Sequence, residues 1–432
     1  METYINPKYS CLAELCLRPS TDNHTVMERV EKIISRVESG GDSALRALAE
    51  EIDGSAPECL ESSSEEFAYA EKAVSDCVKK AIAEAYGNIE AFHRAQLPQA
   101  VELETSPGVR CSQKAVPIQR VGLYIPGGTA PLFSTVLMLA IPAKVAQCKE
   151  VILCTPVSRQ TGRVAPEVLY AAKVCGIDKV YKVGGAQAIA AMAFGTETIA
   201  KVDKIFGPGN QYVTTAKQLL GNRTVAIDLP AGPSEVMVMA DSSAVASFVA
   251  ADLLSQAEHG ADSQVILLCD SEGFADKVQE EIQAQLKVLG RSEIAAKALE
   301  NSRVIIFNGD DSRSRMTEFA NLYGPEHLII SLDNPWEIAA QIVSAGSVFI
   351  GNWSPESAGD YASGTNHTLP TCGWSRAYSG VNIDSFIRKI TFQELSESGL
   401  RNLSQTITAM AEAEGLQAHA NAVSIRMGKA SL

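Results

Sequence analysis

The chain has 432 residues, which is enough for about three domains of ordinary size with a sizeable hydrophobic core. Hydrophobic residues make up 46% of the chain and charged residues 20%, fractions that are typical of a soluble globular protein. The formal net charge of -14 argues against nucleic acid or an anionic membrane surface as the main partner.

The sequence favours a cytoplasmic protein. Its amino-terminal segment, METYINPKYSCLAEL, lacks the basic and apolar regions of a secretory signal. The most apolar run, 135–146, is interrupted by Pro142 and Lys144 and is too short to span a bilayer. The ten cysteines include no CxxC pair, which predicts reduced thiols and no cysteine-based zinc site.

The first 120 residues carry little recognisable chemistry. Residues 1–24 are predicted to form an amino-terminal arm, and 102–117 is polar with a tendency to form strands. Residues 25–49 and 63–94 are each predicted to form an amphipathic helix with an acidic face.

From Arg120 the pattern changes to an alternation of strands and helices. In the first block, short β-rich runs (VGLYIP, EVILCTP, DKVYKVG, KVDKIFG) are separated by helical runs (PLFSTVLMLAIPAKVA, APEVLYAAKVCG, AQAIAAMAFG). In the second block, strands are predicted near QVILLCD, RVIIFN, EHLIISL and SVFIGNW. Two such blocks indicate an α/β protein with parallel sheets covered by helices. The tail from about Gly380 is predicted to be mostly helical.

Glycine-rich turns follow three strands of the first block: Ile125-Pro-Gly-Gly-Thr129, Val183-Gly-Gly-Ala-Gln187 and Phe206-Gly-Pro-Gly-Asn210. At the carboxyl ends of parallel strands, such turns let a ligand approach the backbone, and helix amino termini favour phosphate. None of the three is a GxGxxG motif, because Tyr212 occupies the third glycine position after Gly207 and Gly209. For each turn taken singly, an ordinary tight turn is an equally good interpretation.

Between the two blocks, a helix is predicted from about Ser243 to Gly260, which can adopt the left-handed geometry that ends a helix. Its apolar stripe of Val245, Phe248 and Val249 continues into Asp252, Gln256 and His259. Polar groups aimed into a core must find partners or line a cleft. His259 on this helix alone is more readily a satisfied core residue than a ligand.

Other acids and histidines stand in similar places. Glu326 and His327 precede a predicted strand and suit proton transfer, but they can share a site only if this Gly-Pro segment is irregular. A loop at 353–367 is crowded with glycine, serine and potential ligands, among them Asp360. In the tail, Glu414 and His419 interrupt apolar helical stripes. The coincidence favours a buried polar site.

In these segments the chain resembles the histidinol dehydrogenase family, and the resemblance runs nearly from end to end. The resemblance is carried by RVGLYIPGGTAPLFSTVLM, VGGAQAIAA, VDKIFGPGN, DLPAGPSEV, DLLSQAEHG, YGPEHLII and WSPESAGDYASGTNH, in that order. It implies two incomplete Rossmann-like domains with parallel-rich sheets, a helical amino-terminal arm and a helical carboxyl-terminal tail. The expected bounds are 1–24 for the arm, 25–120 with 236–379 for the domain carrying zinc and catalysis, 121–235 for the NAD side, and 380–432 for the tail.

The resemblance also implies the reaction: oxidation of L-histidinol, through bound L-histidinaldehyde, to L-histidine, with two NAD and one zinc ion per site. In this reading His327 takes the alcohol proton and Glu326 activates water for the second oxidation. The family is a homodimer whose tail, here carrying Glu414 and His419, is exchanged between subunits. The residues that match functional positions of the family are Gln256, His259, Asp360 and His419 for zinc, Ser234, Gln256, His259, His327, Asp360, Tyr361, Glu414 and His419 for substrate, Tyr124, Gln187 and Asn210 for NAD, and Glu326 and His327 as proton acceptors.

Two alternatives stay open. Relatives on the same fold oxidise other small polar alcohols, although keeping Glu414 and both metal histidines favours a substrate with an imidazole and an amine. A non-catalytic nucleotide-binding or structural protein would be expected to lack Glu326, His327 or a zinc ligand, and all of them are present.

Overall fold

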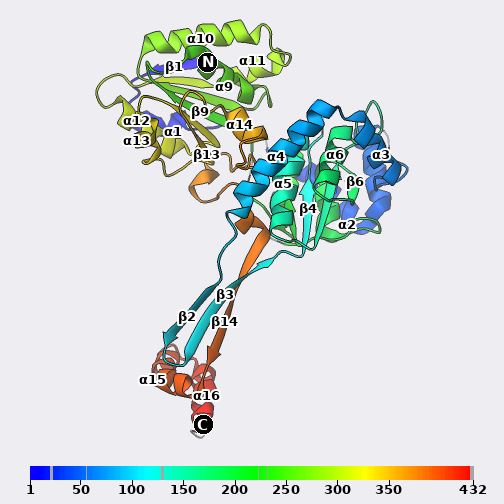
Figure 1. Cartoon of the computed structure of the whole chain (residues 1–432), viewed down its shortest axis with the longest axis vertical. Coiled ribbons are helices and arrows are strands. Elements are labelled where there is room, and N and C mark those ends of the chain that lie inside the picture. The colour runs from blue at the N-terminus through cyan, green and yellow to red at the C-terminus, as the bar shows by residue number, and fades with distance from the viewer. Residues whose placement is uncertain (20–22, 55, 128–130, 222, 231, 429–432) are drawn as a thin grey trace. The chain divides into compact units, whose positions relative to one another are not determined.

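The computed structural model describes residues 1–19, 23–54, 56–127, 131–221, 223–230 and 232–428. The chain forms two compact units (Figure 1). The first comprises Met1–Gln96 and Ile118–Phe386, and the second comprises Leu97–Pro117 and Ile387–Leu432. Among the described residues, no helix is both long and apolar enough to cross a membrane.

A six-stranded sheet lies in the first unit, with strand order β1-β11-β10-β9-β12-β13. Every pairing in it is parallel, as expected for strands that alternate with helices. The central pairings place Glu235 beside Gln264 and His327 beside Val236. The strands are β1 (Glu2–Ile5), β9 (Glu235–Ala240), β10 (Gln264–Cys269), β11 (Arg303–Ile306), β12 (His327–Ser331) and β13 (Ser347–Ile350).

Both faces of this sheet are buried, because alternate residues of its strands point to opposite sides. On one face Val236, Val238 and Leu267 pack against α9, α10 and α11. On the other face Met237 and Met239 pack against α1, α12 and α13. The helices are α1 (Tyr9–Leu15), α9 (Ala246–Ala257), α10 (Glu272–Leu286), α11 (Ser292–Glu300), α12 (Ser312–Tyr323) and α13 (Pro335–Ala339), and α14 (Glu356–Tyr361) follows β13.

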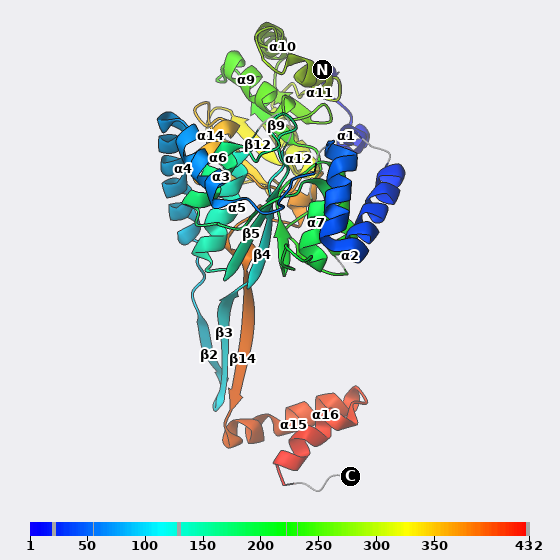
Figure 2. The ribbon, with the colours of Figure 1, turned by 90° about the vertical axis from the view of Figure 1, so that its right-hand side faces the viewer.

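A five-stranded sheet, also in the first unit and also parallel, has the order β6-β5-β4-β7-β8. Helices α2, α7 and α8 lie over one face, and α5 and α6 lie over the other beneath α3 and α4 (Figure 2). The strands are β4 (Arg120–Tyr124), β5 (Glu150–Thr155), β6 (Val180–Lys182), β7 (Lys204–Phe206) and β8 (Ala226–Ile227). The helices are α2 (Asn23–Asp53), α3 (Ser64–Ala73), α4 (Asp76–Arg94), α5 (Phe133–Val145), α6 (Pro166–Val174), α7 (Gly185–Phe194) and α8 (Gln211–Gly221).

The second unit contains a three-stranded antiparallel sheet in the order β14-β3-β2 and two helices. Ser396 caps the first helix by accepting a hydrogen bond from the Gly399 N–H. The elements are β2 (Val101–Ser106), β3 (Val109–Pro117), β14 (Ile387–Leu395), α15 (Glu397–Ala413) and α16 (Gln417–Arg426). Two short 3-10 helices, Trp374–Arg376 and Ile383–Phe386, precede β14 in the first unit.

The alternating α/β pattern is confirmed, and several local predictions are corrected. Residues 63–94 form two helices, because Val74 is extended and Ser75 starts α4 as its amino-terminal cap. The expected arm contains β1 and α1, and the expected helical tail includes the nine-residue strand β14. Helix α9 ends at Ala257 with Glu258 still right-handed, so Gly260 does not terminate it in the left-handed region.

The expected domain bounds group 25–120 with 236–379. In the structure, α2, α3 and α4 contact the helices of the five-stranded sheet instead. Residues 97–117 belong to the second unit together with the carboxyl-terminal segment. The apolar faces of these helices indicate burial but not the sheet that buries them.

Candidate active site

Polar and charged side chains meet at the amino edge of the six-stranded sheet. Glu235 begins β9 and His327 begins β12, and the two strands are neighbours. A helix that follows a parallel strand returns to the edge where that strand started, so the last turn of α9 brings Gln256 to the same place. All three residues are buried.

Glu326 and His327 are placed together by the backbone before β12. Gly324 has a φ of 63° and ends α12, and Glu326 then lies in a bend rather than in the strand. The Ser347 N–H donates to the Glu326 carbonyl over 2.9 Å. A Cβ on Gly346 would lie 2.5 Å from that carbonyl, so glycine permits this approach. The expectation of an irregular segment is met, because Glu326 Oε2 lies 3.6 Å from His327 Nδ1.

The imidazole of His327 has its two nitrogens in different surroundings. Nδ1 lies 3.0 Å from Gln256 Nε2 and 3.2 Å from the Glu235 carbonyl oxygen. Nε2 is buried without a hydrogen-bond partner among the described residues, and Asp360 Oδ1 is 3.5 Å away. Burial alone would lower the pKa of His327, but the surrounding carboxylates raise it well above its ordinary value. Nε2 therefore has no hydrogen bond within the described chain and faces the Asp360 carboxylate.

Helix α14 supplies two carboxyl groups one turn apart, Glu356 and Asp360. Glu356 is buried, and burial raises its pKa well above the ordinary value. Its Oε2 has no hydrogen-bond partner among the described atoms. Burial would also raise the pKa of Asp360, but His327 outweighs this effect and lowers it. On α9, burial raises the pKa of Asp252 to about 7.

The Gln256 amide has a fixed orientation. Its Nε2 lies 3.3 Å from the Glu235 carbonyl oxygen and 3.3 Å from Glu326 Oε2, both acceptors. Its Oε1 is buried and has no partner among the described residues. An unpartnered buried acceptor is costly, so this oxygen suits a ligand that the chain does not supply.

Asp360 and His259 lie close enough for the histidine to lower the pKa of the aspartate. Together with Gln256 they offer one nitrogen and two oxygens from the first unit. No group of three or more His, Cys, Asp and Glu side chains is arranged to hold a metal within the described part of the chain. The donor types fit zinc in part, since Gln256 is a further donor and a fourth ligand is needed from elsewhere.

Glu414 and His419, predicted for the same site, belong to the second unit. Glu414 follows α15 as its carboxyl-terminal cap, and His419 lies in the first turn of α16. Both side chains are exposed. The structure therefore brings Gln256, His327 and Asp360 together and leaves these two on a separate body.

The predicted NAD residues Tyr124, Gln187 and Asn210 line one cavity of about 1750 Å³ at the carboxyl edge of the five-stranded sheet. Tyr124 ends β4, and its hydroxyl accepts a hydrogen bond from the Gly185 N–H over 3.0 Å. Gly185 starts α7, so a helix amino terminus faces this cavity. Among the described residues that line this cavity, none belongs to the cluster around His327. Basic residues at the rim are Arg29, Lys32, Arg36 and Arg159.

A buried ion pair between Lys217 and Asp228 anchors the loop that carries Asn210. Lys217 Nζ donates to the Gly207 carbonyl over 2.9 Å, and the Gly207 N–H donates to Asp228 Oδ2 over 2.8 Å. Both the N–H and the carbonyl of Gly207 are therefore hydrogen-bonded to this ion pair. Of the first glycine-rich turn, Gly128 and Thr129 lie outside the described residues.

Ser234 and Tyr361 complete the predicted set. Ser234 immediately precedes β9 and is half-buried, whereas Tyr361 ends α14 with 55% of its surface exposed. Sequence reasoning did not single out Glu356, although its position four residues before Asp360 signals a shared helical face. Glu235 had no comparable signal, because its partners are distant in the chain.

A family model described as histidinol dehydrogenase matches residues 16–427. A histidinol dehydrogenase of Bacteroides thetaiotaomicron is 54% identical over 415 residues, covering 96% of each chain. One of Vibrio parahaemolyticus is 53% identical over 415 residues, covering 95% of this chain and 94% of its own length. The crystal structure of histidinol dehydrogenase from Elizabethkingia anophelis superposes with a TM-score of 0.95 at 51% identity, covering 99% of this chain and 98% of that chain.

Proposed function

Because this chain belongs to the histidinol dehydrogenase family of oxidoreductases, we propose that it oxidises L-histidinol through bound L-histidinaldehyde to L-histidine, the last step of histidine biosynthesis. The proposal includes two equivalents of NAD and one zinc ion per site. The observation that carries it is the cluster of buried Gln256, Glu326 and His327 with half-buried Asp360, which joins a proton acceptor to an unpartnered amide oxygen.

Gln256, His259 and Asp360 would hold zinc together with His419. Support comes from the unpartnered Gln256 Oε1 and from the closeness of Asp360 to His259. When bound, zinc would hold the imidazole and amine of the substrate, and NAD would accept one hydride in each oxidation. Substrate contacts are proposed for the zinc-binding residues and for Ser234, His327, Tyr361 and Glu414.

His327 takes the alcohol proton at Nε2 in the first oxidation. This nitrogen has no hydrogen-bond partner among the described residues, while Nδ1 is contacted by the Glu235 carbonyl and the Gln256 amide. Asp360 is one of the groups that raise the pKa of His327. Committing that carboxylate to a cation weakens its effect and moves the imidazole toward the neutral form that a base needs.

Glu326 takes a proton from the water that adds to the aldehyde, so that the hydrate can lose the second hydride. Its Oε2 accepts the Glu235 N–H over 2.8 Å, which fixes the carboxylate beside His327. A buried, oriented carboxylate of this kind is suited to general base catalysis. The dinucleotide is proposed to bind in the cavity lined by Tyr124, Gln187 and Asn210.

Glu414 and His419 are proposed to complete the site of a partner subunit in a homodimer. The support is that both side chains are exposed and belong to the second unit, whereas the catalytic cluster belongs to the first. A site built in this way would be incomplete in one chain alone. We place the enzyme in the cytoplasm, as expected for a biosynthetic step.

The test is the number of NADH molecules formed per L-histidinol consumed, with and without a strong zinc chelator. Two NADH per substrate, lost on chelation and restored by zinc, is the expected result. The Glu326→Gln variant should stop after one NADH and accumulate aldehyde, with the second oxidation slowed by about 10²- to 10⁴-fold. The exposed Glu337→Gln variant, on α13, is the control. Normal completion of the second oxidation by Glu326→Gln would contradict the role of Glu326.

A further inference from the structure

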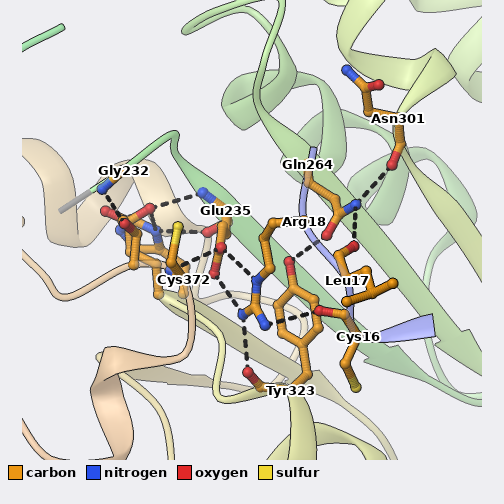
Figure 3. A network of polar contacts seen from close by, with 12 residues as sticks. Cys16, Leu17, Arg18, Gly232, Glu235, Gln264, Asn301, Tyr323 and Cys372 are labelled. Atoms are coloured by element: carbon orange, nitrogen blue, oxygen red, sulfur yellow. Dashed lines mark hydrogen bonds and ion pairs between the residues drawn. The ribbon is translucent and has the colours of Figure 1, made fainter. Parts of the chain in front are cut away.

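A network of polar contacts joins the amino-terminal segment to Glu235 (Figure 3). At its centre, the guanidinium of Arg18 makes two hydrogen bonds to the Glu235 carboxylate, from Nε over 2.9 Å and from Nη2 over 3.1 Å. The same guanidinium lies 3.5 Å from the centroid of the Tyr323 ring and donates to the Tyr323 carbonyl over 2.9 Å. A paired, stacked arginine of this kind has a fixed geometry.

Glu235, which Arg18 binds through its side chain, also contacts the catalytic cluster through its backbone. The main-chain N–H of Glu235 donates to Glu326 Oε2 over 2.8 Å. Its main-chain carbonyl lies 3.2 Å from His327 Nδ1 and accepts from Gln256 Nε2 over 3.3 Å. The side chain and the backbone of Glu235 therefore face different partners, and a shift of one moves the other.

The Glu235 carboxylate needs the positive charge of Arg18 because it is buried beside a second acid. The carboxylate of Glu235 is 1% exposed and lies close enough to Glu326 for the two negative charges to repel each other. Arg18 supplies the opposite charge, while the Cys372 N–H adds one neutral hydrogen bond over 3.0 Å. Without the guanidinium, a buried carboxylate loses its charged partner and must rotate, protonate or draw in water. Each of these changes disturbs the first residue of β9.

We propose that Arg18 is a positioning residue for the reaction, acting through the Glu235 peptide to hold Glu326 and His327 in their catalytic geometry. Arg18 is 217 residues from Glu235 in the chain, and its hydrogen bonds to described residues go to Cys16, Glu235 and Tyr323. The inference rests on the proposed roles of Glu326 and His327. Misplacement of a catalytic group by about 1 Å can cost about 100-fold in rate.

The test compares variants of the full-length enzyme in steady-state kinetics with L-histidinol and NAD. Arg18→Met should lower kcat by about 10- to 100-fold and leave the KM for NAD unchanged, because the dinucleotide cavity lies on the other sheet. Arg18→Lys should recover part of the loss, since it restores the charge without the two-pronged geometry. Arg303→Met is the matched control: Arg303 Nη1 also ties down this segment, at the Leu15 and Leu17 carbonyls, without touching Glu235.

The control variant should keep kcat within about twofold of the parent enzyme. The inference is overturned if Arg18→Met loses no more kcat than Arg303→Met, or if Arg18→Lys is as slow as Arg18→Met. Should Arg18→Met not fold, the comparison is made between Arg18→Lys and Arg303→Met, and equal kcat values overturn it. If the unsubstituted enzyme itself leaves L-histidinol unoxidised, the proposed function has failed instead.

Discussion

Replacing Lys217 by methionine should loosen the loop that carries Asn210 in the proposed dinucleotide site. The Lys217 and Asp228 side chains are only 5% and 1% exposed, so the substitution leaves a buried carboxylate without its counter-charge. Removing one member of a buried pair costs about 3–5 kcal/mol. Asp228 keeps hydrogen bonds from the Gly207 and Leu229 N–H groups, each over 2.8 Å, which places the expected loss near the lower limit, about 3 kcal/mol.

The loss is best measured as the free energy of local opening from native-state hydrogen exchange of peptides covering 204–221. The three tryptophans of the chain, at 336, 353 and 374, all lie outside the five-stranded sheet, so their fluorescence does not report on it directly. The KM for NAD should rise while kcat at saturating NAD changes little. These two readouts separate a loosened loop from a general loss of folding.

The Lys217→Met/Asp228→Asn double variant serves as the control. Because Asp228→Asn removes the carboxylate charge as well, the double variant should lose about 1–3 kcal/mol less stability than the sum of the losses of the two single variants. A loss below about 1 kcal/mol for Lys217→Met would place the pair with exposed ion pairs and refute the reasoning. Simple additivity in the double variant would refute it as well.

Two further predictions concern the subunit arrangement and the response to acid. His419→Ala and Glu326→Gln chains should each fail alone to complete the oxidation to L-histidine. Co-refolding the two should restore about a quarter of L-histidine formation if the tail completes the partner's site, and none if each site uses its own tail. Asp241 accepts hydrogen bonds from Ser243, Asp333 and Arg313. Burial alone would raise the pKa of Asp241, but these bonds lower it. The ionised carboxylate therefore stabilises the fold fully above the pKa of Asp in the unfolded chain, about 4, and this stabilisation is lost as the pH falls through the lower pKa of the folded chain. Asp241→Asn should therefore destabilise at pH 7 in urea unfolding and matter progressively less below about pH 4, whereas a constant difference would contradict the assignment.

Much of the first unit is predictable from local patterns. Apolar runs such as those that form β5 and β10 are continuous and β-branched, which is the pattern of strands buried on both faces. Strand order is different, because it depends on pairings far apart in the chain. The edge position of β1, beside residues 303–306, leaves no trace in the sequence of either segment.

The carboxyl-terminal segment shows a second limit. Strand β14 has the sequence IRKITFQEL, which mixes charged and apolar residues at a spacing that also suits a helix. Its partner β3 supplies the backbone hydrogen bonds that decide between the two states. Local propensity cannot include a partner that lies so far away.

Some residues of the candidate site can also be predicted from the sequence, whereas others cannot. Glu326, His327, Gln256 and Asp360 stand out because acids, amides and histidines are unusual at the ends of apolar elements. Glu235 and Arg18 look ordinary in the sequence, since an acid at the start of a strand and an arginine before a proline are both common at surfaces. Only the fold shows that they are buried together.

The pairing of β3 with β14 has a consequence for synthesis on the ribosome. Pro117 lies opposite Ile387, so the last strand of this sheet leaves the ribosome about 270 residues after the strand that it must join. At about 5–20 residues per second, this interval lasts on the order of 15 to 50 s. If β2 and β3 pair during this interval, β3 has an open edge on its other side until a β14 arrives, from its own chain or from a neighbour on the same message.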